Sequence, residues 1–328
     1  MQNRFVSLVL SSPRRRAMPI AVYPGATLIG ARVQDIVTNA QTQFEASAAL
    51  HHRFHTPFAL SAMDLSVEAE AFGAQLVMSA NEIPTVVGRS VASLSQAQAL
   101  AVPKPGDKRT QVYLEAVSLL KQLPDKPMVL AGCIGPFSLA GRLAGVSEAL
   151  ELTLSEPDLM HTLLAKCEQF LTSYVQAFKA AGADGVIMAE PGAGLLSPRG
   201  MSQFSSAYIR SIVAAVSDDS FSFILHNCAA KVLHLPALLE TGSQAYHFGA
   251  PMDLVAALGK VSPETVLCGN LDPSAVFVQS TPEEVAQRTR NLLEATKDHR
   301  NYVISSGCDV PPPSSMANLD VFFKTVNG

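Results

Sequence analysis

A histidine and a cysteine stand two residues apart at the end of one strongly apolar run of the sequence. The stretch SFILHNCAAK (222–231) carries His226 and Cys228 directly after its apolar part. If this run is a β-strand, its side chains alternate between two faces, so His226 and Cys228 point the same way and Asn227 points the opposite way. A further cysteine, Cys308, follows 80 residues after Cys228, in the stretch SSGC (305–308).

These residue types suit a zinc ion. Two thiolates and one imidazole are ligands that Zn²⁺ accepts in tetrahedral geometry. Three protein ligands leave one position for water or substrate, which is typical of a catalytic zinc site. The sequence therefore predicts a metal site formed by His226, Cys228 and Cys308. The alternative is that both cysteines are small hydrophobic residues that only pack.

The elements that must position these residues are short apolar runs with amphipathic stretches between them. Continuous apolar runs are typical of parallel strands that helices cover. One helix is predicted over 159–182, where the apolar spacing is three and four and Gly182 ends it, and another over 281–298, which begins with Thr-Pro-Glu-Glu. The predicted strands are 18–24, 57–63, 127–133, 184–190, 222–227, 244–249, 265–270 and 302–307.

Eight strand–helix units in 328 residues predict an α/β fold, a (β/α)8 TIM barrel, with a doubly wound open sheet as the competing architecture. We expect a single domain over 1–328, with residues 1–17 as an N-terminal extension that leads into the first strand. The region 79–110 is the longest loop-like segment and is expected to cross the barrel mouth.

In such a barrel the functional residues gather at the carboxyl ends of the strands. Glu190 ends a very apolar strand, and an ionised carboxylate there needs a partner, so it is expected to contact substrate, to act as a displaceable zinc ligand or to form an ion pair. The polar and metal-binding residues at the predicted strand ends are Asp64, Cys133, Glu190, His226, Cys228, His247, Asn270, Asp272 and Cys308. We expect His247, Asn270 and Asp272 to contact a substrate.

Composition excludes several classes of partner. The formal net charge of −4 argues against nucleic acids and anionic membranes as partners. Five cysteines, an odd number, without an obvious secretory signal indicate a reducing compartment, so a cytoplasmic protein is expected. No run of about 18 uninterrupted apolar residues is present, so no membrane span is predicted. The sequence leaves the oligomeric state undetermined.

Together with ILHNCAAK, four further stretches carry a family resemblance. The chain resembles the uroporphyrinogen decarboxylase superfamily and, within it, the branch of cobalamin-dependent methyltransferases that act on coenzyme M. The four stretches are SVEAEAFGA (66–74), GCIGPFSLAGRLAG (132–145), CGNLDPSAVFVQSTPEEV (268–285) and SSGCDVPPPSSMANLDVF (305–322). The zinc motif of that branch, His-x-Cys with a distant Cys, falls on His226, Cys228 and Cys308.

The resemblance implies a mechanism. A small thiol such as coenzyme M would bind the zinc, lose its proton and attack the methyl group of a methyl-Co(III) corrinoid, a methylcobalamin-type substrate, to give a methyl thioether and Co(I). No corrinoid-binding module follows Gly328, so the corrinoid is expected on a partner protein that docks at the barrel mouth. Arg142 and Arg199 are the candidates to bind the sulfonate of coenzyme M.

Three alternatives stay open. The decarboxylases carry two arginines in a segment that here reads VYPGATLIGAR (22–32), where both are missing, which argues against decarboxylation. They also carry an essential Asp nine residues before a glycine, and Asp64 stands nine before Gly73, so Asp64 remains a catalytic candidate. Related enzymes also use other acceptors, including folates. A non-catalytic barrel with a structural zinc would need a fourth ligand, with Glu190, Asp64 or Cys133 as candidates.

Overall fold

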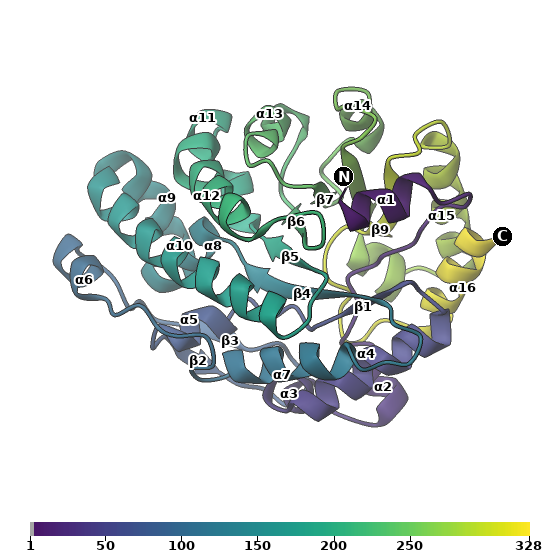
Figure 1. Cartoon of the computed structure of the whole chain (residues 1–328), viewed down its shortest axis with the longest axis horizontal. Coiled ribbons are helices and arrows are strands. Elements are labelled where there is room, and N and C mark those ends of the chain that lie inside the picture. The colour runs from purple at the N-terminus through teal and green to yellow at the C-terminus, as the bar shows by residue number, and fades with distance from the viewer. Residues whose placement is uncertain (1–2) are drawn as a thin grey trace.

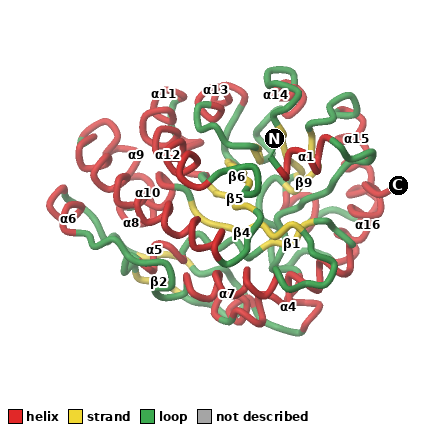
Figure 2. The backbone as a smooth tube through the Cα atoms, in the orientation of Figure 1, coloured by secondary structure: helices red, strands yellow, loops and turns green. Residues whose placement is uncertain are grey.

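The core of the protein is a curled sheet of seven parallel strands surrounded by helices (Figures 1 and 2). The computed structural model describes residues 3–328. The strands lie side by side in the order β1 (Phe58–Leu60), β4 (Met128–Ile134), β5 (Gly185–Ala189), β6 (Ser222–Asn227), β7 (Ala245–Phe248), β8 (Val266–Leu271) and β9 (Tyr302–Ser306). An α/β fold with a parallel sheet, as predicted, is thereby confirmed, and each of these seven strands falls within about one residue of a predicted apolar run.

The helices lie on the outside of the curled sheet and in the loops at its two edges (Figure 1). The α-helices are α1 (Arg4–Leu10), α2 (Gly25–Ile29), α3 (Val33–Thr38), α4 (Ala40–Phe54), α5 (Val67–Ala71), α6 (Leu94–Ala99), α7 (Thr110–Leu120), α8 (Pro136–Ala144), α9 (Val146–Ser155), α10 (Pro157–Ala180), α11 (Pro198–Met201), α12 (Ala207–Val216), α13 (Leu235–Leu239), α14 (Leu254–Leu258), α15 (Pro282–Ala295) and α16 (Met316–Asn327). Short 3₁₀ turns at Pro191–Leu195 and Val232–His234 and π turns at Ser202–Ser206 and Pro273–Val278 complete the connections.

Local sequence signals explain where the first of the two predicted helices ends and where the second begins. The helix predicted over 159–182 is α10, and the chain leaves it through Gly182, whose φ of 102° lies in the region that favours glycine. The helix predicted over 281–298 is α15, which begins with a capping box between Thr281 and Glu284. Among residues 3–328, no helix combines the length and the apolar character that crossing a membrane requires.

The strands form because they are apolar on both faces. Every residue of β4, β5, β6, β7 and β9 is buried, as expected for parallel strands covered by helices. The register pairs Ala189 with His226 and His226 with His247, so the ends of three consecutive strands meet at one edge. The buried hydrophobic residues of sheet and helices belong to one connected cluster.

The strand predicted over 18–24 is not present as a strand in the structure. Residues 16–20 run beside β9, with hydrogen bonds from Ile304 N to Arg16 O (3.0 Å) and from Met18 N to Ile304 O (2.9 Å), but they form only an isolated bridge. At the next position the Ile20 amide bonds to the Ser306 hydroxyl (3.0 Å) instead of a backbone carbonyl. On the opposite side, Pro19 has no N–H to offer β1. A closed eight-stranded ladder therefore does not form.

The segment 79–110 contains more structure than a loop. Strand β2 (Gln75–Val77), which lies just before this segment, forms an antiparallel hairpin with β3 (Thr85–Val87) inside it, and helix α6 follows. Val77 is 56% exposed and Val87 is 41% exposed, so this hairpin is not a core element. Its strands have no continuous apolar run, which is why the sequence pattern did not predict them.

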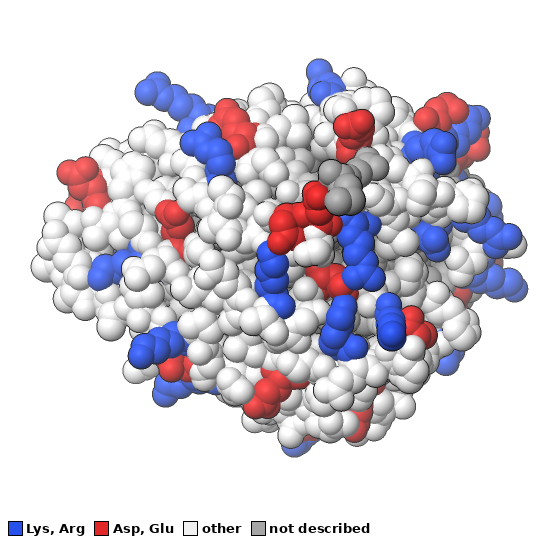
Figure 3. Space-filling model, in the orientation of Figure 1, with Lys and Arg blue, Asp and Glu red and all other residues white. Residues whose placement is uncertain are grey.

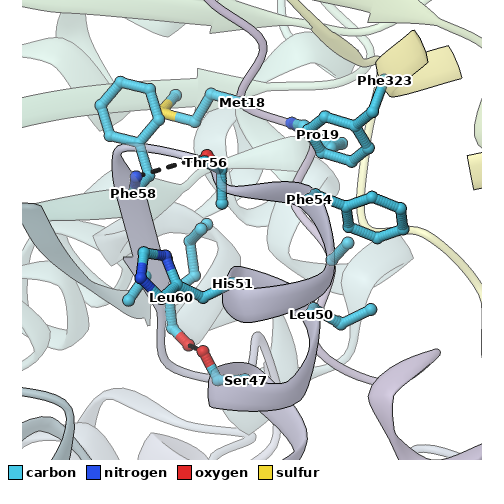
Figure 4. Close-up of a pocket in the computed structure, with 12 residues that line it drawn as sticks. Met18, Pro19, Ser47, Leu50, His51, Phe54, Thr56, Phe58, Leu60 and Phe323 are labelled. Atoms are coloured by element: carbon cyan, nitrogen blue, oxygen red, sulfur yellow. Dashed lines mark hydrogen bonds between the residues drawn. The ribbon is translucent and has the colours of Figure 1, made fainter. Parts of the chain in front are cut away.

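A small cavity lies between α4, the segment at Met18 and Pro19, β1 and α16 (Figure 4). Its volume of about 20 Å³ is close to the space that one water molecule needs. The wall is mostly apolar, with Phe54 stacked on Phe323, and the Ser47 hydroxyl donates to Leu60 O (2.7 Å). This cavity is a packing gap and not a ligand site.

The charge distribution agrees with the composition. On the face shown in Figure 3, Lys and Arg side chains are interspersed with Asp and Glu, and most of the visible surface carries neither. Several of these charges are paired; Lys121 and Arg4 both contact Asp184, for example.

Candidate metal centre

His226, Cys228 and Cys308 meet at the carboxyl edge of the sheet. His226 is the last residue but one of β6, Cys228 follows that strand directly, and Cys308 lies two residues after β9. One ligand atom of each residue lies within 4.8 Å of the other two. His226 is buried, whereas both cysteines are partly exposed. The three residues that the sequence singled out for metal binding are therefore adjacent in space.

The turn after β6 is held by the side chain that points away from the site. Asn227 Oδ1 accepts hydrogen bonds from Ala229 N (3.1 Å) and Ala230 N (2.8 Å), and Asn227 Nδ2 donates to Glu190 O (2.7 Å). The loop that follows β7 passes close to Cys228 at Gly249. A glycine is needed there, because a Cβ at this position would lie 2.2 Å from the Cys228 carbonyl oxygen. Cys228 is thus fixed by its backbone.

The two thiols shift each other's pKa in opposite directions. A hydrogen bond from the Cys308 thiol lowers the pKa of Cys228 to about 7, and the same contact, with burial, raises the pKa of Cys308 to about 12. A pair in which one sulfur is readily deprotonated is suited to binding a soft metal ion. In contrast, burial raises the pKa of Cys133 far above its ordinary value, and Cys133 lies within β4 outside the cluster.

His226 has one ring nitrogen without a protein partner. Its Nε2 is buried without a hydrogen-bond partner of normal geometry, and His226 opposes the rise in the pKa of the neighbouring Cys308 thiol. Its Nδ1 lies 2.8 Å from Nδ1 of His247 and 3.3 Å from the His247 carbonyl oxygen. A buried, unpartnered imidazole nitrogen beside two thiols is the arrangement that a bound metal would satisfy. The three residues therefore fit a zinc ion.

His247 is placed behind His226 rather than at the mouth. It is fully buried on β7, and its Nε2 lies 2.7 Å from the Ser305 hydroxyl. Burial lowers the pKa of His247 well below its ordinary value, and the neighbouring His226 adds to this effect. Both ring nitrogens of His247 contact protein groups, His226 and Ser305, so His247 has no ring nitrogen left to contact a substrate.

A pocket of about 210 Å³ opens in front of the three residues. Most of its wall is apolar and comes from four parts of the chain, namely Ile20, Met63 with Leu65, Ile83 with Pro84, and Ala189 with Pro191. Ile83 and Pro84 belong to the turn of the β2–β3 hairpin, so the segment that was expected at the mouth does line it. The apolar wall limits the access of water to whatever binds at the cysteines.

Two ionisable side chains besides the three cluster residues line this pocket. Arg142, from α8, is half-buried, and no carboxylate among residues 3–328 forms an ion pair with it. Asp309 follows Cys308 directly, and its Oδ2 is buried without a hydrogen-bond partner. Burial raises the pKa of Asp309 well above its ordinary value. The pocket therefore joins a sulfur-rich end to a cationic group.

The Glu190 carboxylate binds the N-terminus of helix α8. Its carboxylate accepts hydrogen bonds from Phe137 N (2.8 Å), Ser138 N (2.9 Å) and the Ser205 hydroxyl (2.9 Å). The first two are free amides in the first turn of α8, where a negative charge is favourable. Burial raises the pKa of Glu190, and these hydrogen bonds oppose the rise. A Cβ at Gly135 would lie 2.4 Å from Glu190 Oε2, so this contact needs a glycine there.

Asp64 is also engaged. Its Oδ2 pairs with Arg109 Nη1 (2.5 Å), and its Oδ1 accepts from both the amide (2.9 Å) and the hydroxyl (2.6 Å) of Ser66. The side chain is fully buried, and Arg109 also contacts Glu70 (2.6 Å). Asp64 thus belongs to a buried ion-pair network behind the pocket wall and does not line the pocket.

The other predicted substrate contacts lie outside the pocket. Asn270 Nδ2 donates to Gly249 O (3.0 Å) and Met252 O (2.7 Å), and Asp272 Oδ1 accepts from Ala275 N (2.7 Å) at the start of a π turn. Arg199 lies exposed on α11. Arg142 is the only one of the predicted substrate-binding residues that lines the pocket.

Comparison with known proteins decides the family. Residues 6–328 match the sequence profile described as uroporphyrinogen decarboxylase (URO-D). The chain belongs to the uroporphyrinogen decarboxylase family. The resemblance stated from the motifs is therefore confirmed.

The chain is similar to proteins with two different described activities. The methylcobamide:CoM methyltransferase MtbA of Methanosarcina mazei is 28% identical over 288 residues, which cover 85% of this chain and 83% of that protein. The uroporphyrinogen decarboxylase of Psychromonas ingrahamii is 27% identical over 299 residues, covering 86% and 82%. A solved methyltransferase from Methanosarcina mazei superposes with a TM-score of 0.88 at 20% identity, over 99% of this chain and 97% of that one, which establishes the shared fold.

Sequence reasoning missed three residues of the centre. Asp309 was present in the quoted stretch SSGCDVPPP, and its position directly after a proposed ligand was the available signal. Ser305 and the carbonyl group of Met18, which accepts a hydrogen bond from Ser305 (2.5 Å), gave none. Serines and backbone carbonyls occur everywhere, and only the tertiary structure brings these two beside His247.

Proposed function

We propose that this protein is a zinc-dependent methyltransferase that transfers a methyl group from a methyl-Co(III) corrinoid, carried by a partner protein, to a small thiol. The observation that carries the proposal is the convergence of His226, Cys228 and Cys308 at the end of a pocket, with a buried His226 Nε2 that has no partner. The similarity to a methylcobamide:CoM methyltransferase supports it.

His226, Cys228 and Cys308 would hold the metal. A zinc ion bound there would lower the pKa of a substrate thiol and keep it as a nucleophilic thiolate at neutral pH. The alternative of a structural zinc is disfavoured because Glu190 binds a helix terminus, Asp64 pairs with Arg109, and Cys133 lies buried in β4. Asp309 lines the pocket, but it lies outside the group of ligand atoms that converge within 4.8 Å. The position that remains is available to substrate.

The chain's own residues orient the substrate between two ends of the pocket. Arg142 would bind an anionic group, and the sulfur would lie at the cysteines. The apolar side chains of Ile20, Met63 and Ile83 would exclude water around the reacting sulfur, which keeps the thiolate poorly solvated and reactive. The methyl donor would approach from the open side of the pocket, at the carboxyl edge of the sheet.

Pocket size and charge favour a small thiol over larger substrates. The volume of about 210 Å³ is below the roughly 300–1,000 Å³ of sites that take drug-sized ligands. One arginine matches one anionic group, as in the sulfonate of coenzyme M, whereas a porphyrinogen carries several carboxylates. A folate or a porphyrinogen would therefore need a different pocket.

We also propose that the chain works as one domain and that residues 16–20 fill the eighth position of the barrel beside β9. Their two backbone hydrogen bonds with Ile304 support this assignment. The extent of the superposition on the methanogen methyltransferase agrees with it.

The test is a methyl-transfer assay with free methylcobalamin and a panel of thiols. The zinc-loaded protein should demethylate methylcobalamin with coenzyme M, and Cys308→Ala should abolish the reaction. An uroporphyrinogen decarboxylase would not depend on Cys308. Decarboxylation of uroporphyrinogen that is equal in wild type and Cys308→Ala, with no demethylation in either, would replace the proposal.

A further inference from the structure

A chain of four groups runs from the N-terminal segment to the metal centre. The Met18 carbonyl accepts the Ser305 hydroxyl hydrogen (Oγ to O, 2.5 Å). Ser305 Oγ lies 2.7 Å from His247 Nε2, and His247 Nδ1 lies 2.8 Å from His226 Nδ1. All of these side chains are buried.

The donor at each step follows from the carbonyl at the far end. A carbonyl oxygen only accepts, so the Ser305 hydroxyl must donate its single hydrogen to Met18. Ser305 Oγ can then only accept, so His247 Nε2 carries a hydrogen. A neutral imidazole has one N–H, which leaves His247 Nδ1 as an acceptor. The nitrogen that faces it, Nδ1 of His226, must therefore donate.

A second contact leads to the same result independently. His226 Nδ1 also lies 3.3 Å from the backbone carbonyl oxygen of His247, which can only accept. Both neighbours of His226 Nδ1 are therefore acceptors. The hydrogen of a neutral His226 sits on Nδ1, and its Nε2 keeps a free lone pair, which is the buried atom without a partner.

We propose that His247 is a positioning residue that, anchored by Ser305 and the Met18 carbonyl, holds His226 in the Nδ1–H tautomer with the Nε2 lone pair directed at the site of Cys228 and Cys308. Without such partners either nitrogen of the ring can carry the hydrogen, and the ring can turn. A ligand held in the binding tautomer does not lose a proton or rotate when the metal arrives. The inference rests on the proposed function only in treating these three residues as a metal site.

The first readout is the tautomer of His226 in the metal-free protein, measured by nitrogen-15 NMR and assigned with a His226→Asn variant. We expect the Nδ1–H form in the wild type. His247→Leu removes the nearer acceptor, Nδ1 at 2.8 Å, and leaves only the backbone carbonyl at 3.3 Å, so it should shift part of the His226 population toward the Nε2–H form. His247→Asn places an amide oxygen where Nδ1 was and should restore the Nδ1–H form. His161→Asn, which changes a histidine paired with Tyr208 outside the centre, should have no effect.

The second readout is the affinity for Zn²⁺, measured by competition with a chromophoric chelator. Loss of a partner behind a metal ligand weakens binding by roughly 10- to 100-fold, so His247→Leu should fall in that range and His247→Asn should recover most of it. Ser305→Ala, which leaves the bulk of the core intact, should produce a smaller loss in the same direction. Ser305→Ala also serves if His247→Leu does not fold.

Three results would overturn the inference. They are an Nε2–H tautomer of His226 in the metal-free wild type, an unchanged Zn²⁺ affinity in folded His247→Leu, and a loss in His247→Asn as large as that in His247→Leu. A protein that binds zinc as expected but transfers no methyl group would defeat the proposed function alone. The tautomer is measured without metal or substrate, so the two failures are distinguishable.

Discussion

Cys228 and Cys308 lie 80 residues apart in the chain, yet their sulfur atoms lie within 4.8 Å of each other and of a ring nitrogen of His226. Strands β7 and β8 lie between the strands that carry them. The curl of the sheet brings the ends of β6 and β9 together, so the pair is a product of the whole fold rather than of a local motif.

The pair predicts the metal content of the protein. Purified without added metal, the wild type should carry about one zinc per chain. His226→Ala and Cys308→Ala should each lose it, because two remaining ligands do not hold Zn²⁺ firmly. Cys268→Ala is the matched control, since Cys268 is buried in β8 outside the cluster and should leave the zinc in place. Elemental analysis decides, and a wild type that stays empty after reconstitution contradicts the metal assignment.

Arg142 should determine the binding of an anionic acceptor. Arg142→Ala removes a charged hydrogen-bond partner worth about 1.5–3 kcal/mol, so KM for coenzyme M should rise roughly 10- to 100-fold with a smaller change in kcat. KM for an uncharged thiol such as 2-mercaptoethanol should hardly change. Arg199→Ala, on the exposed surface of α11, should behave as wild type. Equal effects of Arg142→Ala on charged and uncharged thiols would show that the arginine does not bind the anion.

Glu190 should matter for stability and not for metal binding. Glu190→Ala leaves the amides of Phe137 and Ser138 and the Ser205 hydroxyl without their acceptor, and each buried unsatisfied group costs about 1–3 kcal/mol. The free energy of unfolding in urea should fall by about 3 kcal/mol or more, with zinc still bound at saturating concentration. A variant of wild-type stability that has lost its zinc would make Glu190 a ligand after all.

Asp64 allows the decarboxylase alternative to be tested directly. Asp64→Asn leaves the buried Arg109 with Glu70, which is partly exposed, as its remaining carboxylate partner, and breaking a buried pair costs about 3–5 kcal/mol. We expect a large drop in the denaturation midpoint, while Asp320→Asn, in the exposed pair with Arg53, should leave it unchanged. If Asp64 instead served as a catalytic group, its substitution would abolish activity in a protein of normal stability.

The buried Glu68 should make stability depend on pH. Burial raises the pKa of Glu68 to about 8 in the folded protein, so the folded state keeps this proton at pH values where the unfolded chain has lost it. The contribution of Glu68 to stability is therefore largest below pH 5 and is lost as pH rises toward 8, with a slope of at most about 1.4 kcal/mol per pH unit.

Glu68→Gln keeps an oxygen for the amide of Ile134 but cannot ionise. Urea unfolding at several pH values should show the wild type losing stability relative to this variant between pH 5 and pH 8. Parallel stability curves for the two proteins would mean that the folded state does not hold the proton of Glu68.

The sequence predicted the sheet well because the signal is physical. Strands such as β5 and β6 must be apolar on both faces, and this leaves continuous runs that are visible without a structure. The exception at residues 18–24 depended on Pro19 and on the Ser306 hydroxyl, which took a backbone position in the ladder. The β2–β3 hairpin was missed because its strands are short and exposed.

The candidate site was predictable to the extent that its residue types are rare. His226, Cys228 and Cys308 could be selected because few other residues bind soft metals. Glu190 and Asn270 were selected only for their positions at strand ends, and their hydrogen bonds show that such positions also serve helix termini and loops. His247 pointed to the right region, but its role depended on Ser305 and a carbonyl group that no pattern could identify.

The three candidate metal ligands come from distant parts of the chain, and this has a consequence for biogenesis. Residues 226–228 leave the ribosome long before residue 308, and the carbonyl behind His247 comes from residue 18. A nascent or truncated chain that ends before β9 can offer only two of the three donors, and it lacks Ser305 as well. Metal occupancy would then report that β9 and the residues up to Cys308 have been made and have docked beside β6.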